Sequence, residues 1–168
     1  RDYSHVVSAY RSPATNGMLR SRTKGVAKNS QHTQGKAMDF FIPGVKLATL
    51  RSTAMQLQVG GVGFYPTSGS PFVHLDVGGV RAWPRMSRDE LARLFPKGNT
   101  IHLPSDGKPL PGYDQALADY KKRVGADSIA IASTAGSVSS SPTVKKKQNL
   151  LSMLFGGGHE GADPDALT

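Results

Sequence analysis

The stretch "FVHLDV", residues 72–77, reads as a β-strand with two unlike faces. Side chains alternate between the two faces of a strand. The apolar set is predicted to pack on the core: Val73, Leu75 and Val77. His74 and Asp76 then lie side by side on the opposite face, which we expect to be exposed. An imidazole beside a carboxylate on such a strand indicates a functional site, although a hydrogen-bonded surface pair is the alternative.

A second stretch, "SQHTQGKAMDF" at residues 30–40, adds another histidine and another aspartate. His32 is predicted to lie in a loop and Asp39 on a strand, with Gly35 allowing the chain to turn between them. If they converge with His74, two imidazoles and one carboxylate have the composition of a catalytic zinc site. Such a site uses three protein ligands and keeps a fourth position open. A loop histidine without a metal is the alternative interpretation of His32.

The apolar pattern around these stretches predicts an α+β fold. Strands are predicted at 4–10, 37–42, 62–65 and 72–77, and helices at 47–57, from 87 onward and at 114–124. Residues 11–20 read as a turn that opens a short helix, and 24–36 read as a loop. Ser87 and Glu90 have the spacing of a capping box. We expect a small antiparallel sheet with helices packed on one side and the candidate zinc cleft on the open face.

The composition of the chain changes after residue 125. Residues 1–125 are predicted to form the folded domain, with part of its N-terminal side missing because the chain begins at Arg1 rather than Met. Residues 126–168 are rich in Ala, Ser, Gly and Lys and are predicted to be a disordered tail. An apolar island, "NLLSMLF" at 149–155, interrupts that tail.

The formal net charge of +9 favours anionic partners. Nucleic acid and an acidic polymer of the cell envelope are candidates, but no ladder of aromatic and basic residues that would stack bases is visible. We therefore expect no nucleic-acid partner. A nucleic-acid binder would show salt-sensitive DNA affinity that survives loss of His32 and His74.

Two absences in the sequence narrow the possibilities further. The chain has no cysteine, so a metal would be held by histidine and carboxylate side chains. No run of about 18 apolar residues predicts a membrane span.

Four stretches together resemble the M15 zinc peptidases of the cell wall, in the branch that includes murein endopeptidases. They are "SAYRSPATN", "SQHTQGKAMDF", "GGVGFYP" and "FVHLDVG", in matching order and spacing over residues 3–83. The wider group includes D-Ala-D-Ala peptidases and shares its fold with the hedgehog signalling domain. The resemblance implies that fold, a Zn²⁺ cofactor, peptidoglycan stem peptides as partner, and a periplasmic or cell-envelope location.

Carried over position by position, the resemblance implies that His32, Asp39 and His74 bind Zn²⁺. Arg11 matches an arginine that faces the scissile carbonyl and stabilises the oxyanion. That role suits a guanidinium, which stays charged and donates in a fork. Ser30 matches a serine that contacts the substrate carboxylate in some relatives. The implied activity is hydrolysis of an amide bond in stem peptides or their cross-links by metal-activated water.

The sequence departs from better-studied relatives at the general base. Several relatives have Glu three residues before the last metal ligand, or His two residues before it, and these positions are Pro71 and Phe72 here. Asp76 is the predicted base or the group that orients the reacting water. Fixing the tautomer of His74 is the alternative role for this carboxylate. The missing base also keeps open a non-catalytic module that binds peptidoglycan through a zinc-stabilised fold.

The remaining candidates are aromatic and histidine residues outside that set. Tyr65 is predicted, with Trp83, to line a groove for the peptide stem, and packing is the alternative for both. His5, His102 and His159 have no partner at ligand spacing and are predicted to be structural or solvated. No motif distinguishes D,D from L,D cross-links, or endopeptidase from carboxypeptidase action.

Overall fold

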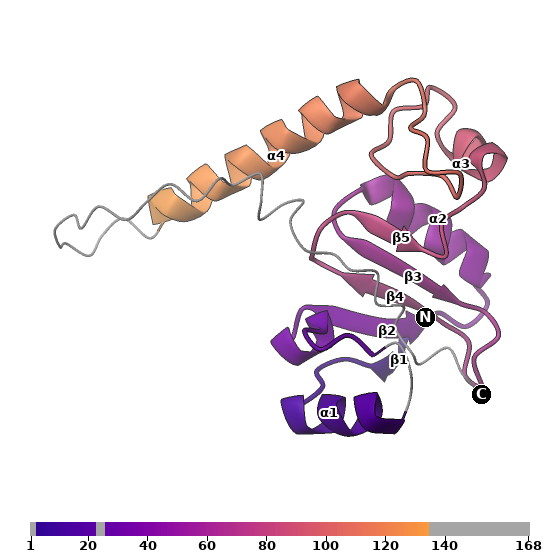
Figure 1. Ribbon diagram of the computed structural model, residues 1–168, viewed down its shortest axis with the longest axis vertical. Coiled ribbons are helices and arrows are strands. Elements are labelled where there is room, and N and C mark those ends of the chain that lie inside the picture. The colour runs from indigo at the N-terminus through magenta and orange to yellow at the C-terminus, as the bar shows by residue number, and fades with distance from the viewer. Residues whose placement is uncertain (1–2, 23–25, 135–168) are drawn as a thin grey trace, which may run out of the picture.

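The computed structural model describes residues 3–22 and 26–134 and confirms the α+β class (Figure 1). One sheet contains the strands β1 (His5–Ser8), β2 (Ala37–Phe41), β3 (Gly61–Tyr65), β4 (Phe72–Asp76) and β5 (Arg81–Trp83). The helices are α1 (Pro13–Arg22), the 3-10 helix η1 (Gln31–Gln34), α2 (Leu47–Leu57), α3 (Arg88–Leu94) and α4 (Tyr113–Thr134).

The strands are arranged in the order β1-β2-β4-β3-β5. The pairs β1–β2, β2–β4 and β3–β4 are antiparallel, as the predicted antiparallel sheet requires. Strand β5 runs parallel to β3, so the sheet is mixed. After β4 the chain crosses the end of β3 and returns along its free edge. With only the residues Arg81–Trp83, β5 is too short for its sequence to show a strand period.

One face of the sheet carries the hydrophobic core. Val62 of β3 and Val73 of β4 are buried there together with Met55 of α2 and Leu91 of α3. Burial of each such side chain stabilises the fold by roughly 1.5–3 kcal/mol. The apolar stripe predicted at 47–57 is therefore confirmed as a helix that covers this face.

Strand β4 differs from its prediction at both of its faces. The strand ends at Asp76, because the Gly78 N–H donates to Asp76 Oδ1 (2.8 Å) and turns the chain. Val77, predicted to lie in the core, is therefore outside the sheet and 69% exposed. The face of His74 and Asp76, predicted to be exposed, is buried, because η1 and β5 place the side chains of His32 and Trp83 against it.

The segment between β1 and β2 is more helical than predicted. α1 is a full helix, with Pro13 at its first position, where an N–H would have no partner inside the helix. Ser12 caps it, because its Oγ accepts from the N–H of Thr15 (3.1 Å). The predicted loop at 24–36 contains η1, so His32 lies in a 3-10 helix rather than in a loop. The capping box predicted at Ser87 is present at the start of α3.

Helix α4 is longer than predicted and extends away from the sheet (Figure 1). It continues to Thr134, and the predicted domain boundary at 125 falls inside it. Its sequence contains no proline to end it. The rest of the predicted tail, including the island at 149–155, lies outside the described residues. Within the described ranges, no helix combines the length and apolar character needed to cross a membrane.

Candidate metal centre

Asp39 and His74 reach the candidate centre from neighbouring strands. Asp39 of β2 pairs directly with His74 of β4 in the antiparallel register, so their side chains project from the same face of the sheet. Asp39 Oδ1 lies 2.7 Å from His74 Nδ1. The alternation predicted from sequence thus brings the aspartate and the second histidine together.

His32 approaches the same face from η1. Ser30 caps this short helix, with its Oγ accepting from the His32 N–H (3.3 Å). Gly35 ends the helix with a φ of 66°, which glycine adopts without strain. The His32 carbonyl accepts from the N–H of Arg11 (3.1 Å). These backbone contacts fix the direction in which the imidazole points.

The three side chains place their donor atoms close to one another. His32 Nε2 lies 3.1 Å from His74 Nδ1 and 3.3 Å from Asp39 Oδ2. One ligand atom from each residue lies within 4.8 Å of the others, and all three residues are buried. Tetrahedral zinc with bonds of about 2.0–2.1 Å holds its ligand atoms roughly 3.3 Å apart. The donor types and their spacing therefore fit a single metal ion.

Each imidazole has a hydrogen-bond acceptor on the side that faces away from the centre. His32 Nδ1 lies 2.6 Å from the carbonyl of Ala9, and a carbonyl can only accept, so Nδ1 carries the proton. His74 has a carboxylate oxygen at each ring nitrogen, with Nδ1 2.7 Å from Asp39 Oδ1 and Nε2 3.1 Å from Asp76 Oδ2. A metal bound at Nδ1 would require the His74 proton on Nε2, where Asp76 can accept its hydrogen bond. His32 Nε2 and His74 Nδ1 then present lone pairs to the centre. Outer acceptors of this kind accompany almost every metal-binding histidine.

The electrostatics of the cluster favour a bound cation. Burial alone would lower the pKa of His32, but the Asp39 carboxylate and the Ala9 carbonyl outweigh it and raise this pKa above its ordinary value. Burial would raise the pKa of Asp39, but His32 and His74 lower it. Asp39 Oδ2 is buried and accepts no hydrogen bond from any described residue. A carboxylate oxygen left in this state is a ready metal ligand.

Asp76 is surrounded by donors. Its Oδ1 accepts from the N–H groups of Gly61 (3.1 Å) and Gly78 (2.8 Å) and from Arg81 Nη1 (2.9 Å). Its Oδ2 accepts from Arg81 Nη2 (2.6 Å) and from His74 (3.1 Å). Burial opposes ionisation, but these bonds hold the pKa of Asp76 far below its usual range. A carboxylate so stabilised is a weak base, and its contact with the outer nitrogen of His74 suits the alternative role of fixing the tautomer.

Tyr65 and Trp83, the predicted groove aromatics, contact each other. The Trp83 indole N–H donates to the Tyr65 hydroxyl, and the Tyr65 ring stacks on Phe72 with centroids 4.6 Å apart. Trp83 also lies against His74, with ring centroids 5.0 Å apart. Tyr65 is buried. These contacts favour the packing interpretation for Tyr65 and make Trp83 one wall of the centre.

Arg11 and Ser30 lie beside His32 in the fold. Arg11 is buried, its backbone N–H bonds the His32 carbonyl, and its Nη1 lies 3.5 Å from Asn16 Oδ1. The Asn16 side chain in turn donates to the carbonyl of Ala27 (3.1 Å). Ser30 is engaged as the cap of η1, where its Oγ is the acceptor, so its hydroxyl proton can still be donated elsewhere.

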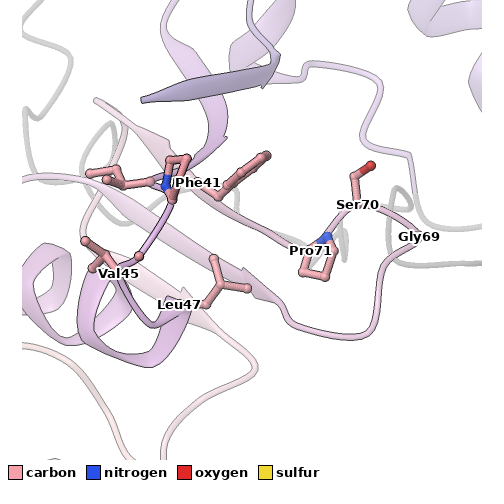
Figure 2. Close-up of a pocket in the computed structure, with 9 residues that line it drawn as sticks. Phe41, Val45, Leu47, Gly69, Ser70 and Pro71 are labelled. Carbon is pink, nitrogen blue, oxygen red and sulfur yellow. The ribbon is translucent and has the colours of Figure 1, made fainter. Parts of the chain in front are cut away.

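A groove of about 450 Å³ lies at the other end of strands β2 and β4 (Figure 2). Its main lining residues are apolar: Phe41, Ile42, Pro43, Val45, Leu47 and Pro71. Phe41 is two residues from Asp39 along β2, but none of the three donor residues lines the groove. Its lining contains no ionisable side chain. The groove is therefore separate from the candidate metal site formed by His32, Asp39 and His74.

Sequence reasoning missed two groups that support the centre. The Ala9 carbonyl has no side-chain signature at all. Arg81 was missed because its partner Asp76 lies on β4 while Arg81 itself lies on the short strand β5. His5 and His102 lie outside the cluster, as predicted: His5 stacks on Phe41 (4.9 Å) and His102 Nε2 lies 3.1 Å from the carbonyl of Met55. His159 lies outside the described residues.

Comparison with known proteins agrees with the resemblance noted from the sequence. A family model of M15 peptidases described as "Peptidoglycan L,D-endopeptidase MepK" matches residues 1–83. Residues 1–83, called the M15 segment below, are similar to the M15 peptidase family. This M15 segment contains all three donor residues and ends at the last residue of β5, while α3 and α4 follow it.

Curated relatives of the M15 segment share about half of its residues. Peptidoglycan L,D-endopeptidase MepK of Escherichia coli (strain K12) is 51% identical over 78 residues, which cover 46% of this chain and 42% of the relative. A probable peptidoglycan L,D-endopeptidase MepK of Haemophilus influenzae is 54% identical over 78 residues, covering 46% of this chain and 41% of the relative. The chain thus spans less than half the length of these relatives. No solved structure gives a significant match.

Proposed function

We propose that this chain is a zinc-dependent peptidoglycan peptidase that hydrolyses amide bonds in stem peptides or their cross-links. The proposal rests on one observation, the buried cluster of His32, Asp39 and His74. Two nitrogen lone pairs and a carboxylate directed at one point repel each other unless a cation lies between them. Nitrogen and carboxylate ligands suit zinc, and the similarity of residues 1–83 to the M15 family supports that metal.

The roles of the residues follow from their contacts. His32 would bind the metal through Nε2, His74 through Nδ1 and Asp39 through its carboxylate. When bound, zinc supplies a water of lowered pKa and polarises a carbonyl. Asp76 holds the outer N–H of His74 and so keeps Nδ1 directed inward. Arg11, anchored beside His32, is the candidate for stabilising negative charge on the substrate oxygen.

The names of the relatives suggest which bond is cut. Both relatives described above are L,D-endopeptidases by name, and we propose L,D cross-links as the substrate here. Ser30 is the candidate donor to a substrate carboxylate, because its hydroxyl proton is not needed for capping η1. A peptidoglycan substrate would place the protein in the periplasm or cell envelope, where a net charge of +9 suits an anionic polymer.

The state of Asp76 supports a second candidate function. The carboxylate predicted as base accepts from five donors, so proton transfer through it is disfavoured. A chain that keeps the metal and lacks an efficient base could bind peptidoglycan without cutting it. The second candidate is therefore a zinc-stabilised peptidoglycan-binding module.

Digestion of purified sacculi separates the two functions. The chain is incubated with sacculi in the presence of zinc or of a chelator, and soluble muropeptides are separated by chromatography. The peptidase releases products with zinc, releases none with the chelator, and consumes L,D-linked dimers before D,D-linked ones. His32→Ala should abolish release, while His5→Ala, which changes a histidine outside the cluster, should retain it. Zinc-dependent binding to sacculi with no released product would instead support the module.

A further inference from the structure

Strand β3 separates β5 from β4, yet side chains of β5 reach the candidate centre on β4. In the register of the sheet, Gly61 pairs with Arg81 and Gly63 with Trp83. Gly63 also pairs with His74 on the other side of β3. The two glycines are two residues apart and so share one face of β3. With no side chains there, they leave a gap across the middle strand.

Side chains from both neighbouring strands fill that gap. A Cβ added at Gly61 would lie 2.4 Å from Asp76 Oδ2 and 2.5 Å from Arg81 Nη1. A Cβ added at Gly63 would lie 2.8 Å from the Trp83 ring. Separations this short are not tolerated in packed proteins. The spacing "GVG" in β3 is therefore what lets β5 contact β4.

Through the gap, Arg81 forms a two-pronged ion pair with Asp76. Its Nη1 and Nη2 bond the two carboxylate oxygens at 2.9 and 2.6 Å. The Asp76 side chain is fully buried, whereas that of Arg81 is 46% exposed. The Arg81 guanidinium also lies over the Trp83 ring, 5.0 Å from its centroid. Paired bonds of this kind fix the plane of a carboxylate as well as its charge.

We propose that Arg81 is a positioning residue for the metal site, acting on His74 through Asp76 while Trp83 packs against the imidazole. This inference rests on the proposed zinc site. Without Arg81, the buried Asp76 carboxylate loses its cation and its fixed plane. The outer N–H of His74 then loses a fixed acceptor, and the ring no longer holds Nδ1 inward. Zinc affinity should fall although every ligand is still present, because outer partners of ligands typically contribute roughly 10–100-fold to metal affinity.

Zinc affinity of the full 168-residue chain tests this inference. Zn²⁺ binding is measured by competition with a chromophoric chelator for the wild type, Arg81→Gln, Arg81→Lys and Arg88→Gln. Arg88 on α3 is the matched control, because two of its nitrogens also bond one carboxylate, that of Asp106, at 2.7 and 3.0 Å. Circular dichroism of each metal-free variant establishes that it is folded at the temperature used. Trp83 is the sole tryptophan, so its fluorescence reports directly on the ring beside His74.

The expected result is zinc affinity lowered about 10–100-fold in Arg81→Gln, an intermediate value in Arg81→Lys, and wild-type affinity in Arg88→Gln. The zinc-dependent change in Trp83 fluorescence should also differ in Arg81→Gln. Wild-type affinity in Arg81→Gln, or an equal loss in Arg88→Gln, overturns the inference and leaves the proposed function standing. If Arg81→Gln does not fold, Arg81→Lys decides by the same comparison. If the wild type binds no zinc, the proposed function fails and the inference fails with it.

Discussion

Asp39 and His74 face each other across the antiparallel pair β2–β4, with Asp39 Oδ1 2.7 Å from His74 Nδ1. The register of β2 and β4 therefore forms the floor of a candidate metal site, because a one-residue shift of either strand would turn its side chain to the opposite face. His32 completes the cluster from outside the sheet.

Removal of one ligand should abolish tight zinc binding. Asp39→Asn keeps the shape of the side chain but replaces the charged oxygen ligand with a neutral amide. We expect zinc affinity to fall by more than about a hundredfold, since loss of partners that merely orient ligands already costs about 10–100-fold. Isothermal titration calorimetry measures the loss. His5→Ala, which removes an imidazole stacked on Phe41 outside the cluster, should leave the affinity unchanged.

The role of Asp76 can be read from metal affinity and turnover together. Asp76→Asn retains the shape of the side chain but removes its negative charge. The hydrogen bond from the outer N–H of His74 and the ion pair with Arg81 are both weakened. If Asp76 orients His74, zinc affinity should fall about 10–100-fold. Unchanged affinity combined with a loss of muropeptide release at saturating zinc would instead assign Asp76 to proton transfer.

The fold should be most sensitive to shortening of a side chain in the hydrophobic core. Leu91 of α3 is completely buried in the cluster with Met55 and Val73. Leu91→Ala should lower the free energy of unfolding by about 2–5 kcal/mol, from lost burial and the cavity left behind. Leu57→Ala is the control, because Leu57 is 57% exposed at the end of α2 and should change stability by less than about 0.5 kcal/mol. Urea unfolding followed by circular dichroism measures both.

A buried histidine outside the centre predicts loss of stability in acid. Burial lowers the pKa of His102 to about 4, although the hydrogen bond that His102 Nε2 donates to the Met55 carbonyl acts in the opposite direction. Its Nδ1 is buried with no hydrogen-bond partner among the described residues, so the charged form is disfavoured in the folded state. The unfolded chain, with an ordinary pKa near 6.5, therefore binds more protons between these two values.

Stability should accordingly be intact above about pH 6.5 and fall by on the order of 2–3 kcal/mol as the pH drops to about 4. Urea midpoints at several pH values between 4 and 7 measure this slope. His102→Gln should flatten it, because glutamine does not titrate and can still donate to the Met55 carbonyl. His5→Gln changes an exposed histidine and should keep the wild-type slope. Identical slopes in wild type and His102→Gln would show that other groups control acid stability.

Much of the fold could be predicted because periodic burial leaves a mark in the sequence. The stripe of Leu47, Leu50 and Ala54 marked α2, and the alternation around Val73 marked β4. Ser87 and Glu90 marked the start of α3, since a capping box is local chemistry. The three residues of the cluster were singled out because His and Asp side chains can bind zinc and because their motifs resemble those of M15 peptidases.

What could not be predicted depends on strand order and on backbone groups. The burial of His74 follows from β5 and η1 covering its face of the sheet, and neither leaves a periodic signal. The ion pair between Arg81 and Asp76 depends on β5 lying beyond β3 and on the missing side chain at Gly61. The tautomer of His32 depends on the backbone carbonyl of Ala9, and a backbone group has no signature in the sequence.

The most direct test of the account is a crystal structure of the zinc-loaded protein, with the metal located by anomalous scattering at the zinc edge. We predict one peak per chain, about 2.0–2.2 Å from His32 Nε2, His74 Nδ1 and a carboxylate oxygen of Asp39. No peak at this cluster, or a zinc ion bound elsewhere on the chain, would contradict the account.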